Sequence, residues 1–245
     1  MPKLTDNLEN FKLPGSYGYS ATKLSELGAT EYTLVTLVVD DSGSIASFRT
    51  EMVAAIKEVV NACRYSPRAD NLMIRLVTFS NSLTEVHGFK LLASCNAGDY
   101  DNVLNVGGMT ALFDATVNSV DATSAYGKTL VDSDFSTNGI VVVITDGADN
   151  QSSNSINSVA TSLKKATANE TLESLVSILI GVNVTDPSIS TALNDLHTQG
   201  GFTQYVELKD ANAKTLAKLA QFVSKSISSQ STALGTGGPS KSLTF

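Results

Sequence analysis

The sequence is poor in basic residues and in cysteine, and each shortage narrows what the protein can be. Its 17 lysines and arginines are outnumbered by 24 acidic residues, for a formal net charge of −7. A nucleic-acid-binding protein needs a basic face that replaces the counterions of its ligand, so this balance argues against that function class. Only Cys63 and Cys95 are present. Cys63 falls on the apolar face of a predicted helix, which favours a buried free thiol over a disulfide.

Long hydrophobic runs are also missing. No stretch approaches the roughly 20 apolar residues needed to span a bilayer. The first ten residues, Met-Pro-Lys-Leu-Thr-Asp-Asn-Leu-Glu-Asn, lack the apolar core of a signal peptide. Together these shortages predict a cytoplasmic protein.

What the sequence contains suits a soluble globular domain. It has 245 residues, of which 42% are hydrophobic and 17% charged, enough for one large α/β domain with extensions. We predict a domain over residues 32–228, preceded by a polar, turn-rich N-terminal extension over residues 1–31 that wraps the domain or reaches a neighbour. Residues 229–245 form a Ser/Gly-rich C-terminal tail whose composition is typical of a flexible linker.

Within the domain, apolar runs alternate with amphipathic segments of helical period. This alternation predicts βαβ units. Buried strands are expected at residues 34–39, 72–79, 140–145, 175–182 and 202–207, and helices at residues 52–63, 114–120, 156–166, 189–196 and 216–227. The run from Val86 to Leu92 is expected to be an antiparallel edge partner of the second strand. The predicted fold is therefore α/β, with a doubly wound, mostly parallel central sheet, one antiparallel edge strand and helices on both faces.

Oxygen-bearing side chains gather where three of these segments meet the sheet edge. Asp40, Ser42 and Ser44 leave the first strand at alternate positions, Thr110 lies in a glycine-rich loop before a helix, and Asp146 follows a central strand. Ligands of a doubly wound sheet lie beyond the carboxyl ends of its strands. Hard cations prefer oxygen ligands, and no His or Cys accompanies these residues, which disfavours zinc. The pattern predicts a site for Mg²⁺ or Mn²⁺.

Other polar residues receive plainer interpretations. Asp41 and Asp149 are interpreted as solvated loop acids, and His87 and His197 as residues without a functional role. Arg75 interrupts a buried strand, so it is predicted to pair with a carboxylate that the sequence does not identify.

Three of these segments resemble known motifs. Residues 38–45, Val-Val-Asp-Asp-Ser-Gly-Ser-Ile, resemble the metal-ion-dependent adhesion site signature of the von Willebrand factor A family. Residues 107–112 resemble that family's distal threonine loop and residues 144–147 its distal aspartate turn. The resemblance covers roughly residues 32–228.

The resemblance implies how the five side chains divide the work. Ser42, Ser44 and either Thr110 or Asp146 would contact the metal directly, and Asp40 and the remaining residue would act mainly through water. An open position on the cation would take a Glu or Asp side chain of a bound protein.

Enzymatic alternatives lack their key residues. A haloacid-dehalogenase-like phosphotransferase needs Asp-x-Asp, but Ser42 stands at the second position. No P-loop, dinucleotide fingerprint or Gly-x-Ser-x-Gly elbow occurs. We therefore predict a non-enzymatic module that binds proteins through a metal ion, within an intracellular assembly. The alternative on the same fold is a structural scaffold subunit, connected through its extended termini, whose binding needs no metal.

Overall fold

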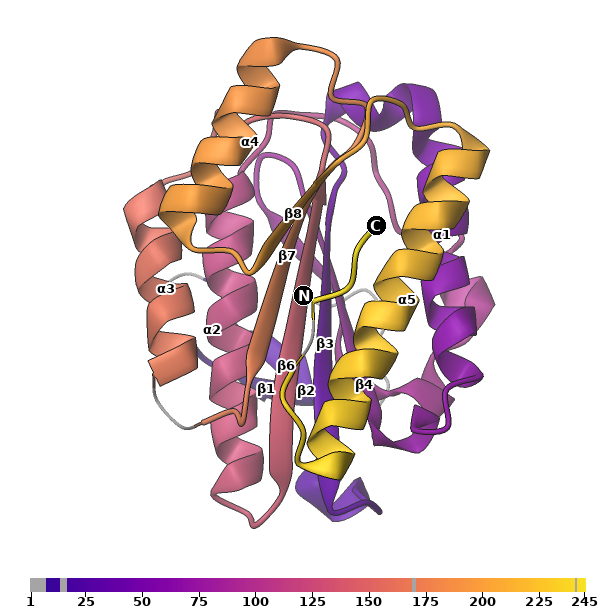
Figure 1. Ribbon diagram of the computed structural model, residues 1–245, viewed down its shortest axis with the longest axis vertical. Helices are drawn as coiled ribbons and strands as arrows, with labels where there is room; N and C mark the ends of the chain where they lie inside the picture. The colour runs from indigo at the N-terminus through magenta and orange to yellow at the C-terminus, as the bar shows by residue number, and fades with distance from the viewer. Residues whose placement is uncertain (1–7, 14–16, 169–170, 241) are drawn as a thin grey trace.

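The computed structural model describes residues 8–13, 17–168, 171–240 and 242–245. Across these residues an eight-stranded sheet runs in the order β1-β2-β5-β4-β3-β6-β7-β8 (Figure 1). The strands are β1 (Glu9–Phe11), β2 (Tyr19–Ala21), β3 (Glu31–Asp40), β4 (Leu72–Phe79), β5 (Leu83–Leu91), β6 (Ser136–Thr145), β7 (Leu175–Gly181) and β8 (Gln204–Glu207).

The centre of the sheet is parallel. β3 lies between β4 and β6, and β7 and β8 follow β6 in the same direction. These strands are rich in Val, Ile and Leu because both of their faces are covered by helices. Their carboxyl ends therefore meet at one edge of the sheet. The predicted doubly wound, mostly parallel α/β fold is confirmed.

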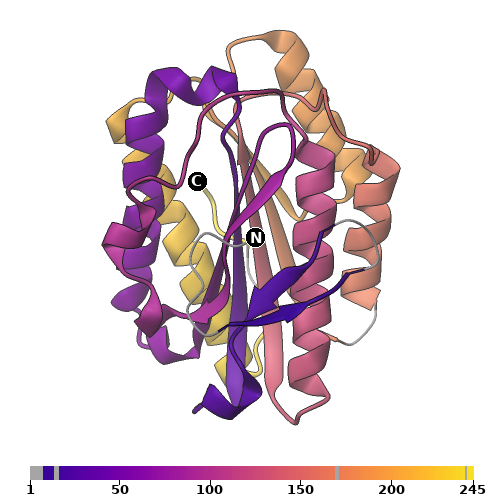
Figure 2. The same ribbon diagram turned by 180° about the vertical axis from the view of Figure 1, so that it is seen from behind.

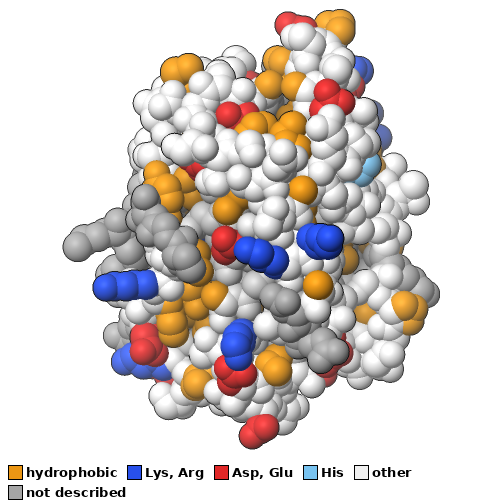
Figure 3. Space-filling view, turned by 90° about the vertical axis from the view of Figure 1, so that its left-hand side faces the viewer, with side chains coloured by type: hydrophobic (Ala, Val, Ile, Leu, Met, Phe, Trp, Pro, Cys, Tyr) orange, Lys and Arg blue, Asp and Glu red, His pale blue; other side chains and the backbone are white. Residues whose placement is uncertain are grey.

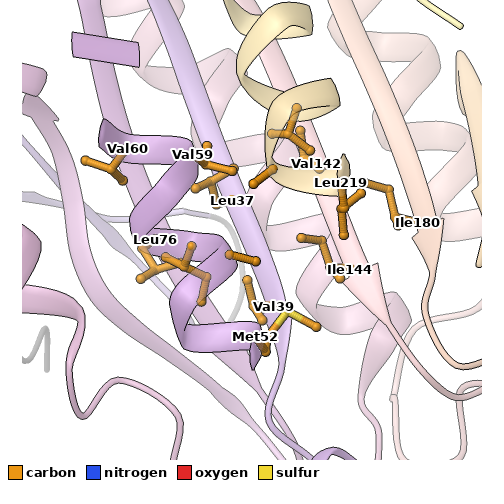
Figure 4. Packing of buried hydrophobic residues seen from close by; sticks show 14 of the residues in the cluster. Leu37, Val39, Met52, Val59, Val60, Leu76, Val142, Ile144, Ile180 and Leu219 are labelled. Atoms are coloured by element: carbon orange, nitrogen blue, oxygen red, sulfur yellow. The ribbon is translucent and has the colours of Figure 1, made fainter. Parts of the chain in front are cut away.

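Helices cover both faces (Figure 1). α1 (Arg49–Arg64) and α5 (Ala213–Thr236) pack on one face, and α2 (Leu112–Val131), α3 (Ile156–Ala168) and α4 (Pro187–Gly200) on the other. Figure 4 shows the first interface, where Leu37 and Val39 of β3 meet Met52 of α1 and Leu219 of α5. Burying each such side chain contributes about 1.5–3 kcal/mol. This packing fixes the end of β3 from which the predicted site begins.

The N-terminal extension adds two strands that the sequence analysis did not predict. β1 pairs antiparallel with β2, and β2 pairs parallel with β5 at Ala21 and Phe89. The hairpin lies beside α2 (Figure 2), where the Tyr19 ring packs edge-on to that of Tyr126 with centroids 6.4 Å apart. The predicted strand β5 is antiparallel to β4 as expected, but it is not at the sheet edge, because the hairpin covers it. Residues 1–7 and 14–16 of this extension lie outside the described residues.

The start of the C-terminal tail is helical, contrary to the linker expectation. α5 continues through Thr236, and Gln230 and Leu234 are buried. The Gln230 side-chain amide donates to the Gly139 carbonyl at 3.2 Å and to the Ser174 hydroxyl at 2.8 Å. Polar side chains thus join apolar ones in holding this last part of the helix, and composition alone does not show this.

Arg75 pairs with Glu85, which answers the question that the sequence left open. The Arg75 Nε atom lies 2.6 Å from Glu85 Oε2, and its Nη2 donates to Asn118 at 3.0 Å. Ser20 of β2 donates to Glu85 Oε1 through both its backbone N–H, at 2.9 Å, and its hydroxyl, at 2.7 Å. The buried ion pair therefore joins β4, β5, α2 and the N-terminal hairpin.

The cysteines and His87 are structural. Cys63 and Cys95 are buried free thiols, as predicted for Cys63, and burial raises the pKa of Cys63 to about 12. Burial lowers the pKa of His87 to about 4, so this side chain stays neutral between the Gly88 carbonyl and the Tyr100 hydroxyl. None of the described helices is long and apolar enough to cross a membrane.

Candidate metal centre

The turn after β3 is built around the Asp40 carboxylate. Asp40 is 0% exposed, and its Oδ1 accepts the backbone N–H of Ser42 at 2.8 Å. Its Oδ2 accepts the hydroxyl of Thr145 at 2.6 Å, from the end of the neighbouring strand β6. These two bonds bend the chain back at the carboxyl edge of the sheet. They hold Ser42 beside the end of β6, where Asp146 follows.

The two serines and Asp146 form a continuous row of oxygen atoms. Ser42 Oγ lies 3.1 Å from Ser44 Oγ, and Ser44 Oγ donates to Asp146 Oδ1 at 2.7 Å. Ser42 and Asp146 are buried, whereas Ser44 is exposed. The middle of the row, at Ser44, is therefore open to solvent, whereas Ser42 and Asp146 at its two ends are withdrawn from it.

Thr110 approaches the same edge from the loop before α2. The Gly43 N–H donates to the Gly108 carbonyl at 3.2 Å, which ties this loop to the β3 turn. The Thr110 N–H donates to Asn150 Oδ1 at 2.7 Å, which ties it to the segment after β6. A β-carbon placed on Gly147 would lie 3.8 Å from the Thr110 hydroxyl oxygen, so that hydroxyl faces the Asp146–Gly147 turn. The structure thus brings all five predicted residues to one place.

The site carries negative charge that the described residues do not neutralise. Among the described residues, no Lys, Arg or His forms an ion pair with Asp40 or Asp146. Burial raises the pKa of Asp40 to about 6, although hydrogen bonds from Thr145 and Ser42 oppose the shift, and the charge of Asp146 adds to it. Burial also raises the pKa of Asp146. Two carboxylates shielded from water without a cation are costly unless a positive charge joins them.

The oxygen atoms have the spacing that a small hard cation requires. Neighbouring ligands of an octahedral Mg²⁺ ion, each at roughly 2.0–2.1 Å from it, lie roughly 3 Å apart. The two oxygen–oxygen distances of the row, 3.1 and 2.7 Å, fit that spacing. In the described chain no three His, Cys, Asp or Glu side chains cluster to hold a metal, so the candidate centre depends on its serine and threonine hydroxyls. The residues fit a divalent cation.

Some contributions were missed or misjudged from the sequence. Thr145 was interpreted only as a strand residue, yet its hydroxyl is bonded to Asp40. Asp41, interpreted as solvated, is buried with 5% exposure, because its carbonyl accepts the Gly107 N–H at 2.9 Å and the loop before α2 covers it. Asp149 is half-buried and accepts the Phe113 N–H at 2.9 Å, so it caps the start of α2. The side-chain oxygen that follows each apolar run was the available signal for Thr145.

Comparison with known proteins gives the fold first. No curated protein matches the sequence. The PilB minor pilin of Streptococcus sanguinis superposes with a TM-score of 0.56 at 18% identity, covering 86% of this chain and 64% of that one. The pilus adhesin SpaC of Lactobacillus rhamnosus GG gives a TM-score of 0.56 at 13% identity, covering 82% and 31%.

A third similar structure holds a metal ion. Proximal thread matrix protein 1 from the mussel byssus, with a zinc-occupied metal-ion-dependent adhesion site motif, gives a TM-score of 0.52 at 18% identity, covering 80% of this chain and 46% of that one. The chain thus spans less than two thirds of the length of each of these proteins. At such identities the likeness shows the fold. Residues 35–225, most of the chain, match the family model of the von Willebrand factor type A domain, and the protein therefore belongs to that family.

Proposed function

We propose that this protein is a binding module that docks an acidic side chain of a partner protein through a divalent cation. The observation that carries the proposal is the row of oxygens from Ser42 through Ser44 to Asp146, next to a second buried carboxylate that lacks a cationic partner in the described chain. Family membership supports a protein-binding, adhesion-type module. The zinc-occupied motif of the mussel protein supports the use of a divalent cation.

The five residues would hold the ion in different ways. Ser42, Ser44 and Thr110 offer neutral hydroxyl oxygens, and Asp40 and Asp146 offer the charge. A cation bound largely by neutral oxygens supplies a strongly electrophilic position that a partner carboxylate can occupy. Asp40 already positions the serine turn by accepting the Ser42 N–H and the Thr145 hydroxyl. Mg²⁺ and Mn²⁺ both suit these oxygen ligands.

The proposed module is not an enzyme, since Ser42 stands where a phosphotransferase would need an acid. The scaffold alternative relied on extended termini as connectors. In the described residues, however, both extensions pack on the chain's own domain: Ser20 bonds to Glu85, and the Leu243 carbonyl accepts the Gln204 side chain at 2.8 Å. This favours the edge of the sheet that carries the candidate metal centre as the binding surface. The intracellular setting expected from the sequence stays a prediction.

Capture of partner proteins tests the proposal. The immobilised full chain should retain its partner in Mg²⁺, release it in EDTA and retain it again when Mg²⁺ is restored. Asp40→Ala should fail to retain the partner, because the variant loses one of two site carboxylates. Asp132→Ala is the matched control, since Asp132 is an exposed acid paired with Lys128 on α2. Equal retention by wild type in EDTA and in Mg²⁺ would support the passive scaffold instead.

A further inference from the structure

The loops around the candidate metal centre have an unusual charge composition. We define the site-flanking loops as residues 40–48, 107–114 and 146–155. They contain five aspartates and no Lys, Arg or His. The nearest base in sequence, Arg49, donates its Nε–H to the Leu104 carbonyl at 2.9 Å. Even without Asp41, four carboxylates outnumber the two positive charges of a divalent cation, so the site-flanking loops stay negative after the ion binds.

A partner carboxylate would meet attraction at one point and repulsion around it. Charges within a Debye length of roughly 8–10 Å still interact at physiological salt. The acid that reaches the cation would be held by direct coordination, whereas a second acid beside it would meet the net negative charge of the site-flanking loops, which contain no base. The carboxylates of Asp114 and Asp149 accept hydrogen bonds from N–H groups of the neighbouring site-flanking loop, which fixes their positions within these loops. Like-charge juxtaposition of this kind selects against wrong partners.

The site-flanking loops also display one large apolar side chain. Met109 is 46% exposed and is the one large exposed hydrophobic residue of the site-flanking loops, all of which lie within the described chain. Its N–H donates to Asn81 Oδ1 at 2.8 Å. The preceding Gly108 has φ of +83°, and a β-carbon there would lie 2.8 Å from the Asn81 amide. The backbone on either side is therefore fixed, and the Met109 side chain is held outward one residue from Thr110.

Bases are found elsewhere on the molecule. On the face drawn in Figure 3, most Lys and Arg side chains lie at mid-height and below, a few lie at the upper right, and the hydrophobic side chains form small separate patches. The charge of the site-flanking loops is thus a local property and not only a consequence of the overall −7.

We infer that the partner presents a single isolated Asp or Glu next to an apolar side chain that packs on Met109, and that segments with clustered acids are rejected. This inference rests on the proposed function and specifies the partner's chemistry. Methionine suits such a contact, because its flexible thioether adapts to different apolar shapes. The apolar neighbour adds binding energy, and the negative charge of the site-flanking loops excludes polyacidic segments.

A random-peptide phage library tests the inference. The full chain is immobilised in Mg²⁺, and bound phage are eluted with EDTA. The eluted peptides should carry one Asp or Glu, an apolar residue within two positions of it, and no second acid nearby. Met109→Ser should bind the selected peptides about tenfold more weakly, the loss expected for one packed apolar contact, while its Mg²⁺-dependent rise in melting temperature is unchanged. Tyr65→Ser is the matched control, because Tyr65 is exposed at the far end of α1.

The outcomes separate the two proposals. EDTA-eluted peptides with runs of acids, or equal binding by Met109→Ser and wild type, would overturn this inference and leave the proposed function standing. Recovery of no EDTA-eluted peptide would overturn the proposed function and the inference with it.

Discussion

Two groups of carboxylates that are withdrawn from water differ in whether the chain supplies their counter-charge. Glu85 lies against Arg75, with Nε and Oε2 2.6 Å apart, and Ser20 satisfies its other oxygen. Asp40 and Asp146 are more deeply buried than Glu85, yet within the described chain neither has a cationic partner. The chain itself supplies the counter-charge of the first carboxylate, whereas the proposed function assigns that role at the second group to a cation.

The comparison indicates a different role for a carboxylate with a counter-charge and for carboxylates without one. A buried charge with its counter-charge supplied by the chain is fixed, and it joins the N-terminal hairpin to the central sheet through Ser20. A buried charge without one stores an unfavourable energy that ligand binding can release. The same chemistry thus holds β4 and β5 together and, under the proposed function, binds a cation at the ends of β3 and β6.

The largest expected effect comes from breaking the complete pair. Arg75→Met leaves the Glu85 carboxylate buried without its counter-charge, and removing one partner of such a pair costs about 3–5 kcal/mol of unfolding free energy. Urea unfolding at neutral pH measures the loss. Adding Glu85→Gln to Arg75→Met should recover a large part of it, because the uncompensated charge is then gone. A single variant within about 1 kcal/mol of wild type would show that the pair contributes little.

The second prediction concerns the incomplete group in EDTA. The pKa of Asp40 is raised from 3.8 to about 6, so the folded state holds a proton that the unfolded state has lost over this range. The associated stability is present below about pH 4 and is lost as the pH rises through about 6, up to about 3 kcal/mol in all. Asp40→Asn does not ionise, so its stability relative to wild type should increase across that window.

The difference between the two proteins is the readout, measured by urea unfolding in EDTA across the window. His87 has a pKa lowered to about 4 and gives the opposite slope, but it does so in both proteins and cancels. Asp132→Asn, which removes an exposed acid outside the candidate centre, is the control for the substitution itself. If the difference in unfolding free energy between Asp40→Asn and wild type did not change with pH, the raised pKa of Asp40 would be contradicted.

The sequence was sufficient for the features that depend on period and on local spacing. The buried strands follow from unbroken apolar runs, and the five candidate site residues, which the structure brings together, were selected by the side chains at or near the ends of those runs. It was insufficient where a contact joins distant segments. Nothing near Arg75 in sequence singles out Glu85 over other acids, and Ser20 lies in a segment without a strand pattern because only three residues pair.

The linker prediction for the end of α5 was wrong for a related reason. Gln230 is buried because its amide bonds to Gly139 and Ser174, and a serine-rich composition does not distinguish that helix from a linker. Hydropathy detects helices that pack through apolar side chains and misses those that pack through hydrogen bonds.

The smallest expected effect compares the two serines that contact these carboxylates. Ser20→Ala removes a hydroxyl bond to Glu85 at 2.7 Å and should cost about 1–2 kcal/mol, equally in EDTA and in Mg²⁺, because the ion pair is present in both. Ser44→Ala removes the 2.7 Å bond to Asp146, but Ser44 is exposed and the cost in EDTA should be below about 0.5 kcal/mol.

In Mg²⁺ the Ser44→Ala substitution should have the larger effect of the two on the gain in melting temperature. Wild type and Ser20→Ala should gain melting temperature because the ion binds only the folded state, whereas Ser44→Ala should gain less. If both serine variants gained as much as wild type, Ser44 would not be part of the cation site, and the contrast between the two groups of carboxylates would depend on Asp40 and Asp146 alone.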